Sequence, residues 1–242
     1  MTAKPRAVVV VVPAHNESVS LPACLESLQD AAANVAAPVA IVVVLDDCHD
    51  DSAKLVGRYG DAVHFVQVYE HNVGAARAAG FRYARVIVDV PHDQTWYATT
   101  DADTQVSCDW LSRQLGSGLA VVCGVVSVPH WRHHPAEVAD RYRARYDSDE
   151  PGHRHIHGAN MGFRASAYWD VGGFASRASG EDVDHHQPRK LGLCSELTEQ
   201  SLQQTGHPLR PIAILACVGA FDRTDYPIHH QLVGDQKALL FA

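Results

Sequence analysis

The sequence lacks the features that mark several large classes of protein. The strongest apolar run near its start, Ala7 to Val12, is followed at once by Pro13 and is far shorter than the roughly 20 residues of a transmembrane helix. It also lacks the small-residue cleavage site of a signal peptide. Acidic residues outnumber basic ones by 28 to 20, the net charge is −8 and no basic patch is present, which disfavours nucleic-acid binding. We therefore expect a soluble, cytoplasmic protein with no transmembrane segment and no nucleic-acid partner.

Several cofactor motifs are missing as well. The six cysteines include no Cys-x-x-Cys pair, which favours reduced thiols over a disulfide framework or a zinc knuckle. The sixteen histidines include a group at His130, His133 and His134, but it lacks the close carboxylate or cysteine partners of a zinc site. Residues 13–18 contain no Gly-x-Gly-x-x-Gly turn and no glycine-rich, basic phosphate loop. A dinucleotide oxidoreductase and a nucleotidyltransferase are therefore disfavoured.

Apolar runs alternate with helical patterns in the first hundred residues. Residues 8–12 and 39–45 are rich in β-branched side chains with no polar alternation, which is typical of strands buried on both faces of a parallel sheet. A weaker strand pattern covers residues 63–68, and helices are expected from Leu21, from Lys54 and over residues 72–88. Shorter elements are expected at 109–115 (helix), 119–128 (strand) and 136–146 (charged helix). This order predicts an α/β fold with an open, mostly parallel sheet and helices on both faces.

Two carboxylates separated by one small residue, Asp101 and Asp103, follow the short strand-like run at 96–98. Magnesium is usually held by one or two carboxylates together with substrate phosphates. The pair is therefore interpreted as half of a Mn²⁺ or Mg²⁺ site whose other half arrives with a nucleoside diphosphate; a solvated turn is the alternative. The polar loops that start at Pro13, Asp46 and Asp101 all follow strands, where ligands bind in such sheets, so we expect them to converge on one crevice.

Seven short motifs occur in a fixed order along the chain: Pro13-Ala14-His15-Asn16-Glu17, Asp46-Asp47, Asn72-Val73-Gly74-Ala75-Ala76-Arg77, Asp101-Ala102-Asp103, Gly158-Ala159-Asn160 with Arg164, Gly172-Gly173-Phe174 and Glu181-Asp182. Together they resemble the family-2 glycosyltransferases over about residues 7 to 184. The resemblance implies the GT-A (Rossmann-like) fold, with an open, mixed, mostly parallel sheet. It also implies a core over 1–184, with a nucleotide-binding half at about 1–105 and an acceptor half at about 106–184. A divergent tail over 185–242 follows this core.

The resemblance implies a role for each matched position. The nucleotide would be bound by residues from three loops and the start of one helix: Pro13, Ala14, His15, Glu17, Asp47, Arg77, Asp101 and Ala102. The acceptor side would be shaped by a later group of residues: His157, Gly158, Ala159, Asn160 and Glu181. Asp47 would bond to the base edge, Asp103 would bind the metal, and Asp182 would be the catalytic base.

The implied activity is the metal-dependent transfer of a sugar, with a hexose expected, from a UDP-, GDP- or dTDP-linked donor to an acceptor hydroxyl with inversion. A positioned carboxylate can take the proton of the attacking hydroxyl, and a divalent metal can stabilise the departing diphosphate. No serine or cysteine nucleophile is then expected. A retaining transferase, which would not need Asp182, and a catalytically impaired nucleotide-sugar-binding protein remain as alternatives.

The pattern of the family ends after Asp184. The family usually continues into an amphipathic helix, whereas this chain has Pro188, and proline inside a helix costs about 3 kcal/mol. The tail is either a diverged lobe or the product of an altered reading frame near Gln187, and an atypical tail is the reason to consider an impaired protein. The sequence does not identify the sugar, the base, the acceptor or the oligomeric state.

Overall fold

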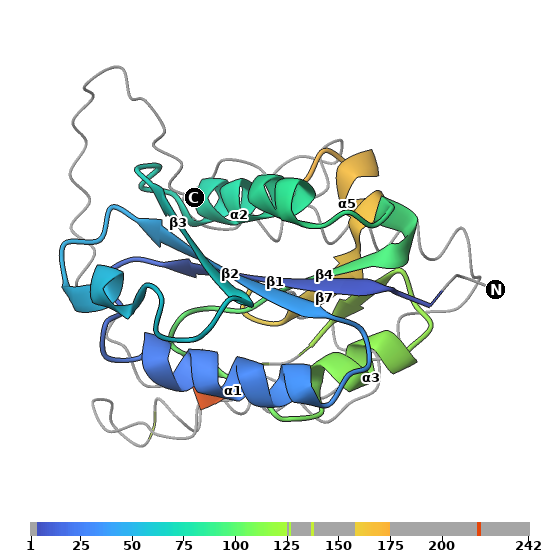
Figure 1. Cartoon of the computed structure of the whole chain (residues 1–242), viewed down its shortest axis with the longest axis horizontal. Coiled ribbons are helices and arrows are strands. Elements are labelled where there is room, and N and C mark those ends of the chain that lie inside the picture. The colour runs from blue at the N-terminus through green and yellow to red at the C-terminus, as the bar shows by residue number, and fades with distance from the viewer. Residues whose placement is uncertain (1–3, 125, 127–136, 138–157, 175–216, 219–242) are drawn as a thin grey trace.

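The computed structural model describes residues 4–124, 126, 137, 158–174, 217 and 218 (Figure 1). In chain order the elements are β1 (Ala7–Ala14), α1 (Leu21–Ala33), β2 (Val39–Asp46), the 3₁₀ helix η1 (Asp51–Leu55), β3 (Val63–Val68), α2 (Val73–Ile87), η2 (His92–Gln94), β4 (Thr95–Thr99), β5 (Thr104–Gln105), α3 (Trp110–Gly116), β6 (Val121–Cys123), β7 (Met161–Arg164), α5 (Ala165–Asp170) and β8 (Cys217–Val218).

Six strands form one open sheet in the order β3-β2-β1-β4-β7-β6. The first four are parallel, and β7 runs antiparallel to both of its neighbours. The expected open, mixed, mostly parallel sheet is therefore confirmed. A second, two-stranded sheet pairs β5 with β8, which brings residues 217 and 218 beside the chain just after Asp103.

Helices cover both faces of the large sheet, with α1 and α3 on one face and α2 and α5 on the other (Figure 1). Alternate residues of β1 serve the two layers: Val8 and Val10 pack in the cluster with α1, and Val9 and Val11 in the cluster with α2. The uniform run of valines thus reflects burial on both faces. Helix α2 lies very close to the sheet, because a Cβ atom on Gly80 would come within 2.5 Å of Val11 Cγ1.

Three local expectations need correction or lie outside the described residues. The helix expected from Lys54 is only the five-residue 3₁₀ helix η1, since the chain turns at Gly57 and Gly60, whose φ angles are +76° and +80°. Of the strand expected at 119–128, β6 covers Val121–Cys123. The charged helix expected at 136–146 lies outside the described residues except for position 137.

The cysteines differ from the expectation in one respect. Cys24, Cys48 and Cys108 carry free thiols, as expected, whereas Cys123 is disulfide-bonded. The absence of a Cys-x-x-Cys spacing therefore did not exclude every disulfide. Among the helices that the structure describes, none has the length and apolar character needed to cross a bilayer.

Candidate functional site

Four loops meet at the carboxyl edge of the parallel strands. Because β1, β2, β3 and β4 run in the same direction, the segments that follow them leave the sheet at one edge, which is where ligands bind in open α/β sheets. These segments contain His15, Glu17, Asp47 and Asp101, which are expected to bind the nucleotide, and Asp103, which is expected to bind the metal. The convergence expected from the sequence is therefore present.

Unusual backbone conformations occur at this same edge. In the part of the chain that the structure describes, the non-glycine residues with positive φ are Asn16, Asp47 and His71, at +57°, +49° and +48°. Each lies in a different loop of the edge. Such conformations are uncommon for residues with a side chain and often occur at functional sites, so the three loops are shaped in a way that sequence periodicity does not reveal.

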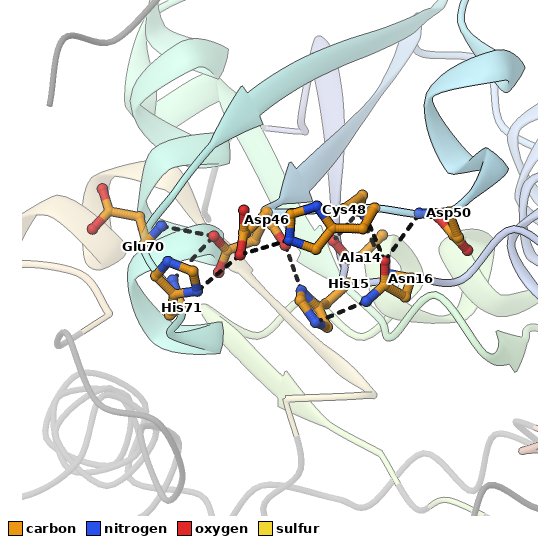
Figure 2. A network of polar contacts seen from close by, with 10 residues as sticks. Ala14, His15, Asn16, Asp46, Cys48, Asp50, Glu70 and His71 are labelled. Atoms are coloured by element: carbon orange, nitrogen blue, oxygen red, sulfur yellow. Dashed lines mark hydrogen bonds and ion pairs between the residues drawn. The ribbon is translucent and has the colours of Figure 1, made fainter. Parts of the chain in front are cut away.

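The loop after β1 is joined to the loop after β2 by hydrogen bonds (Figure 2). The side-chain oxygen of Asn16 accepts from the backbone N–H of His49 at 2.7 Å and of Asp50 at 3.3 Å. In the opposite sense, the Asp50 carboxylate accepts from the N–H of Ser18 at 2.8 Å and of Ser52 at 3.0 Å. These reciprocal bonds fix residues 14–18, the expected nucleoside loop, relative to β2.

Asp50 provides a test of this loop-to-loop connection. Burial alone would raise its pKa, but the hydrogen bonds from Ser52 and Ser18 outweigh burial and lower the pKa from 3.8 to about 2. A carboxylate whose pKa is lower in the folded chain than in the unfolded chain stabilises the fold at pH values above the unfolded pKa. This stabilisation is lost as the pH falls from 3.8 toward 2.

We therefore expect Asp50→Ala to lower the free energy of unfolding by about 1–2 kcal/mol at pH 7, with a smaller difference at pH 3. Urea denaturation at the two pH values measures both quantities. Asp51→Ala is the matched control: the Asp51 carboxylate and Lys54, 2.8 Å apart, are both 69% exposed, and such pairs contribute little. An equal decrease in the free energy of unfolding of the two variants at pH 7 would contradict the prediction.

The adjacent acids Asp46 and Asp47 have different surroundings. Asp46 is buried, and its carboxylate accepts from three consecutive backbone N–H groups in the loop between β3 and α2: Glu70 at 2.7 Å and His71 at 3.1 Å (Figure 2), and Asn72 at 3.0 Å. Asn72 in turn caps α2 by accepting from the N–H of Ala75 at 2.9 Å. Asp46 is thus committed to holding a loop, which leaves Asp47 as the acid that can contact a ligand.

The Asp47 carboxylate lies between two histidines. Its oxygen Oδ2 is 3.3 Å from Nε2 of His49 and 3.3 Å from Nδ1 of His71, and its side chain is 18% exposed. A third histidine, His15, makes a 2.6 Å hydrogen bond between Nδ1 and the carbonyl oxygen of Asp46. The sequence motifs pointed to His15 but not to His49 or His71; the only available signal was the presence of a histidine two residues after Asp47 and directly before Asn72.

Arg77 connects the expected donor and acceptor residues. It is buried, and its Nη2 donates to Oδ1 of Asp101 at 2.5 Å. A Cβ atom on Gly158 would lie 2.4 Å from Arg77 Nη1, so the backbone at 158 packs directly on the guanidinium group. The guanidinium carbon also lies 5.7 Å from the centre of the Phe174 ring. The structure therefore brings together Arg77, Asp101 and Gly158, which are far apart in sequence.

Asp103 lies in a strongly negative environment. Burial and the nearby charges of Asp101 and Glu17 raise its pKa from 3.8 to about 7. The pKa of Glu17 is also raised, by burial and then by Asp50 and Asp101. Within the described ranges, no three His, Cys, Asp or Glu side chains are grouped so that they could hold a metal ion. The carboxylates thus concentrate negative charge without completing a coordination shell.

The segment at 158–160 lies beside the end of β4, because β7 pairs with β4. The Thr100 hydroxyl donates to the carbonyl oxygen of Ala159 at 2.8 Å. The Asn160 side chain is fully buried, and its oxygen accepts from Nε1 of Trp110 at 2.9 Å. Asn160 is thus held by internal contacts, and its expected role on the acceptor side stays a prediction. His157, Glu181 and Asp182 lie outside the described residues, and their roles stay predictions.

Solved structures with the same fold include glycosyltransferases from two organisms. S. aureus TarS 1-349 in complex with UDP-GlcNAc aligns with a TM-score of 0.60 at 13% identity, over 91% of this chain and 61% of that chain. The mannosyltransferase PcManGT from Pyrobaculum calidifontis, in complex with GDP-Man and Mn²⁺, aligns with a TM-score of 0.59 at 18% identity, over 92% of this chain and 59% of that chain. Identities this low show the fold alone, which is that of GT-A glycosyltransferases.

The family relationship comes from the sequence. No curated protein matches the chain, and the chain spans 36% of a longer TarS structure and about 60% of the two structures above. The model of the family described as "Glycosyl transferase family 2" matches residues 9–172. This range includes most of the motifs and the whole described carboxyl edge. The chain therefore belongs to glycosyl transferase family 2.

Proposed function

We propose that the chain is a metal-dependent, inverting glycosyltransferase that moves a sugar from a nucleoside diphosphate to an acceptor hydroxyl. The observation that carries the proposal is the position of Asp101 and Asp103 directly after β4, at the carboxyl edge of the sheet, where burial and the charges of Asp101 and Glu17 raise the pKa of Asp103 to about 7. Family membership supports it. Two structures of the same fold hold nucleotide sugars, UDP-GlcNAc in one and GDP-Man in the other.

The donor set at this edge fits a hard divalent cation. Asp101 and Asp103 supply carboxylate oxygens, which Mn²⁺ or Mg²⁺ prefers as ligands. Asp101 is paired with Arg77, which leaves Asp103 for the cation. Asp103 would hold the cation, and phosphate oxygens of the donor would supply further ligands. When bound, the cation would stabilise the negative charge that forms on the diphosphate as the sugar leaves.

The other side chains would bind and orient the reactants. The loop with His15 and Glu17 would hold the nucleoside, and Asp47 would accept a hydrogen bond from the base. Arg77 would keep Asp101 in place near the ribose, since the pair is already formed. Gly158 and Ala159 would shape the acceptor side, and Asp182 would take the proton of the acceptor hydroxyl.

Binding of the donor can be tested by thermal unfolding with UDP-, GDP- and dTDP-sugars in the presence of Mn²⁺. A ligand at 100 times its dissociation constant stabilises the folded state by about 2.7 kcal/mol, which gives a measurable rise in the unfolding midpoint. The same samples show whether the sugar is hydrolysed from the donor in a metal-dependent reaction. No stabilisation by any of the three donors would contradict the proposal.

Asp47→Ala is expected to weaken donor binding by about tenfold to a hundredfold, because it removes a charged hydrogen-bond acceptor from the base edge. The rate at saturating donor should change much less, since the base is remote from the bond that breaks. Steady-state kinetics with a varied donor concentration separates the two effects. Asp89→Ala, at an exposed carboxylate after α2, is the control. A fall in the saturated rate with unchanged affinity would show that the role of Asp47 is assigned wrongly.

A further inference from the structure

The two histidines beside Asp47 both lie next to the same carboxylate oxygen. His49 Nε2 and His71 Nδ1 both approach Oδ2, each at 3.3 Å. A carboxylate offers about four lone-pair sites, two on each oxygen. Two imidazole nitrogens therefore crowd Oδ2, and Oδ1 is the oxygen to which we assign the contact with a ligand.

Both histidines are held in place by their backbones, although their rings are 75% and 64% exposed. The N–H of His49 donates to the Asn16 side chain at 2.7 Å. The N–H of His71 donates to the buried carboxylate of Asp46 at 3.1 Å, and its φ of +48° is a conformation that the loop must impose. The two imidazoles thus come from two loops that are fixed separately, and they meet at the same oxygen.

Nucleobases differ in how they can use such a carboxylate. Guanine presents two adjacent donors, the ring N1–H and the exocyclic amine, and these match both oxygens of a free carboxylate. Uracil and thymine present a single ring donor, N3–H, between two carbonyl groups. At Asp47, the amine of guanine would have to reach the oxygen that two imidazole rings already crowd, so that a donor would be left unpaired. A uracil-type base would pair N3–H with Oδ1 and turn a carbonyl toward the imidazoles.

We propose that His49 and His71 make the donor site selective for a base with a single ring N–H, the uracil type, over guanine. The inference rests on the proposed function, because it requires that Asp47 contacts the base of the donor. The selection combines an attractive contact at Oδ1 with a repulsive one at Oδ2, and binding sites commonly gain specificity from such a combination. The two histidines are specificity-determining residues in this scheme and take no part in the chemistry.

Calorimetry with UDP, dTDP and GDP in the presence of Mn²⁺ tests the inference. The wild-type protein should bind UDP or dTDP at least about tenfold more tightly than GDP, as expected when one buried donor is left unpaired. The UDP and dTDP measurements then show which of the two bases is preferred. His49→Ala combined with His71→Ala should bring the affinities for the uracil-type nucleotide and for GDP close together, mainly through tighter binding of GDP.

Two further variants control for effects of the substitutions that do not come from the loss of the two imidazole rings. His49→Gln with His71→Asn keeps an amide N–H donor near each ring nitrogen and should retain most of the preference. His92→Ala changes a histidine that precedes β4, at the opposite edge of the sheet, and should retain all of it. Because both site rings are mostly exposed, all variants should unfold at the wild-type temperature.

The outcomes separate this inference from the proposed function. If nucleoside diphosphates bind but GDP is bound as tightly as UDP and dTDP, or if the double alanine variant keeps the wild-type preference, the inference is overturned and the proposed function stands. If the protein binds none of the three nucleotides in the presence of Mn²⁺, the proposed function is overturned and the inference with it.

Discussion

Asp103→Ala is expected to abolish the metal dependence of nucleoside diphosphate binding. The site has few ligands of its own for a cation, and Asp103 is the carboxylate whose pKa burial, Asp101 and Glu17 raise to about 7. Removing it takes away the ligand that we assign to the cation and part of the negative charge that attracts the cation. Because cation stabilisation of the leaving group is worth several kcal/mol, sugar transfer should fall by at least about a hundredfold.

The measurement is calorimetry with UDP, with and without a chelator, on the wild type, Asp103→Ala and the control Asp89→Ala. The wild type and the control should bind much more weakly with chelator, whereas Asp103→Ala should bind equally weakly in both conditions. The variant should remain folded, since it removes a carboxylate from an unfavourable electrostatic environment. Equal binding by the wild type with and without metal would refute the metal assignment.

Asp182→Asn should reduce sugar transfer by about 10²–10⁴-fold, the usual cost of removing a general base. Asp182 lies outside the described residues, and its role comes from the motif Gly180-Glu181-Asp182. The asparagine keeps the shape of the side chain and removes its basicity, so donor binding should be unchanged. Asp170→Asn is the control, because it neutralises an exposed carboxylate at the end of α5 and should retain full activity.

The stereochemistry of the product tests the same residue independently. An inverting enzyme gives a β-linked product from an α-linked donor, which NMR of the anomeric proton distinguishes. Near-normal transfer by Asp182→Asn together with retention of the anomeric configuration would favour the retaining alternative. Donor binding by a wild-type protein that transfers no sugar would instead favour the impaired, nucleotide-sugar-binding alternative.

The sequence was sufficient to predict the helices and strands whose residues have uniform surroundings. β1 and β2 are buried on both faces and consist mainly of β-branched residues, so their pattern has only one reasonable interpretation. The helix expected over residues 72–88 is present as α2, Val73–Ile87, and Asn72 is the residue that caps it. The helix expected from Lys54 was wrong because two glycines in left-handed conformations end the 3₁₀ helix η1, and propensity alone does not show how many residues precede such a turn.

The candidate site was predictable where it depends on strand ends and was not where it depends on contacts between loops. Parallel strands place Asp47 and Asp101 at one edge whatever their neighbours are. In contrast, the commitment of Asp46 to the N–H groups of residues 70–72 is set by the tertiary fold. For the same reason, the sequence motifs did not reveal His71 as a neighbour of Asp47.

The close packing of Gly158 on Arg77 makes position 158 a constraint on the donor side of the site. A residue with a side chain here would place its Cβ atom within 2.4 Å of the Arg77 guanidinium nitrogen. The guanidinium group is buried and holds Asp101, so it would have to shift and would disturb that ion pair. If residues 158–160 face the acceptor, as the family motifs imply, a change of acceptor segment that replaces Gly158 would therefore also disturb donor binding.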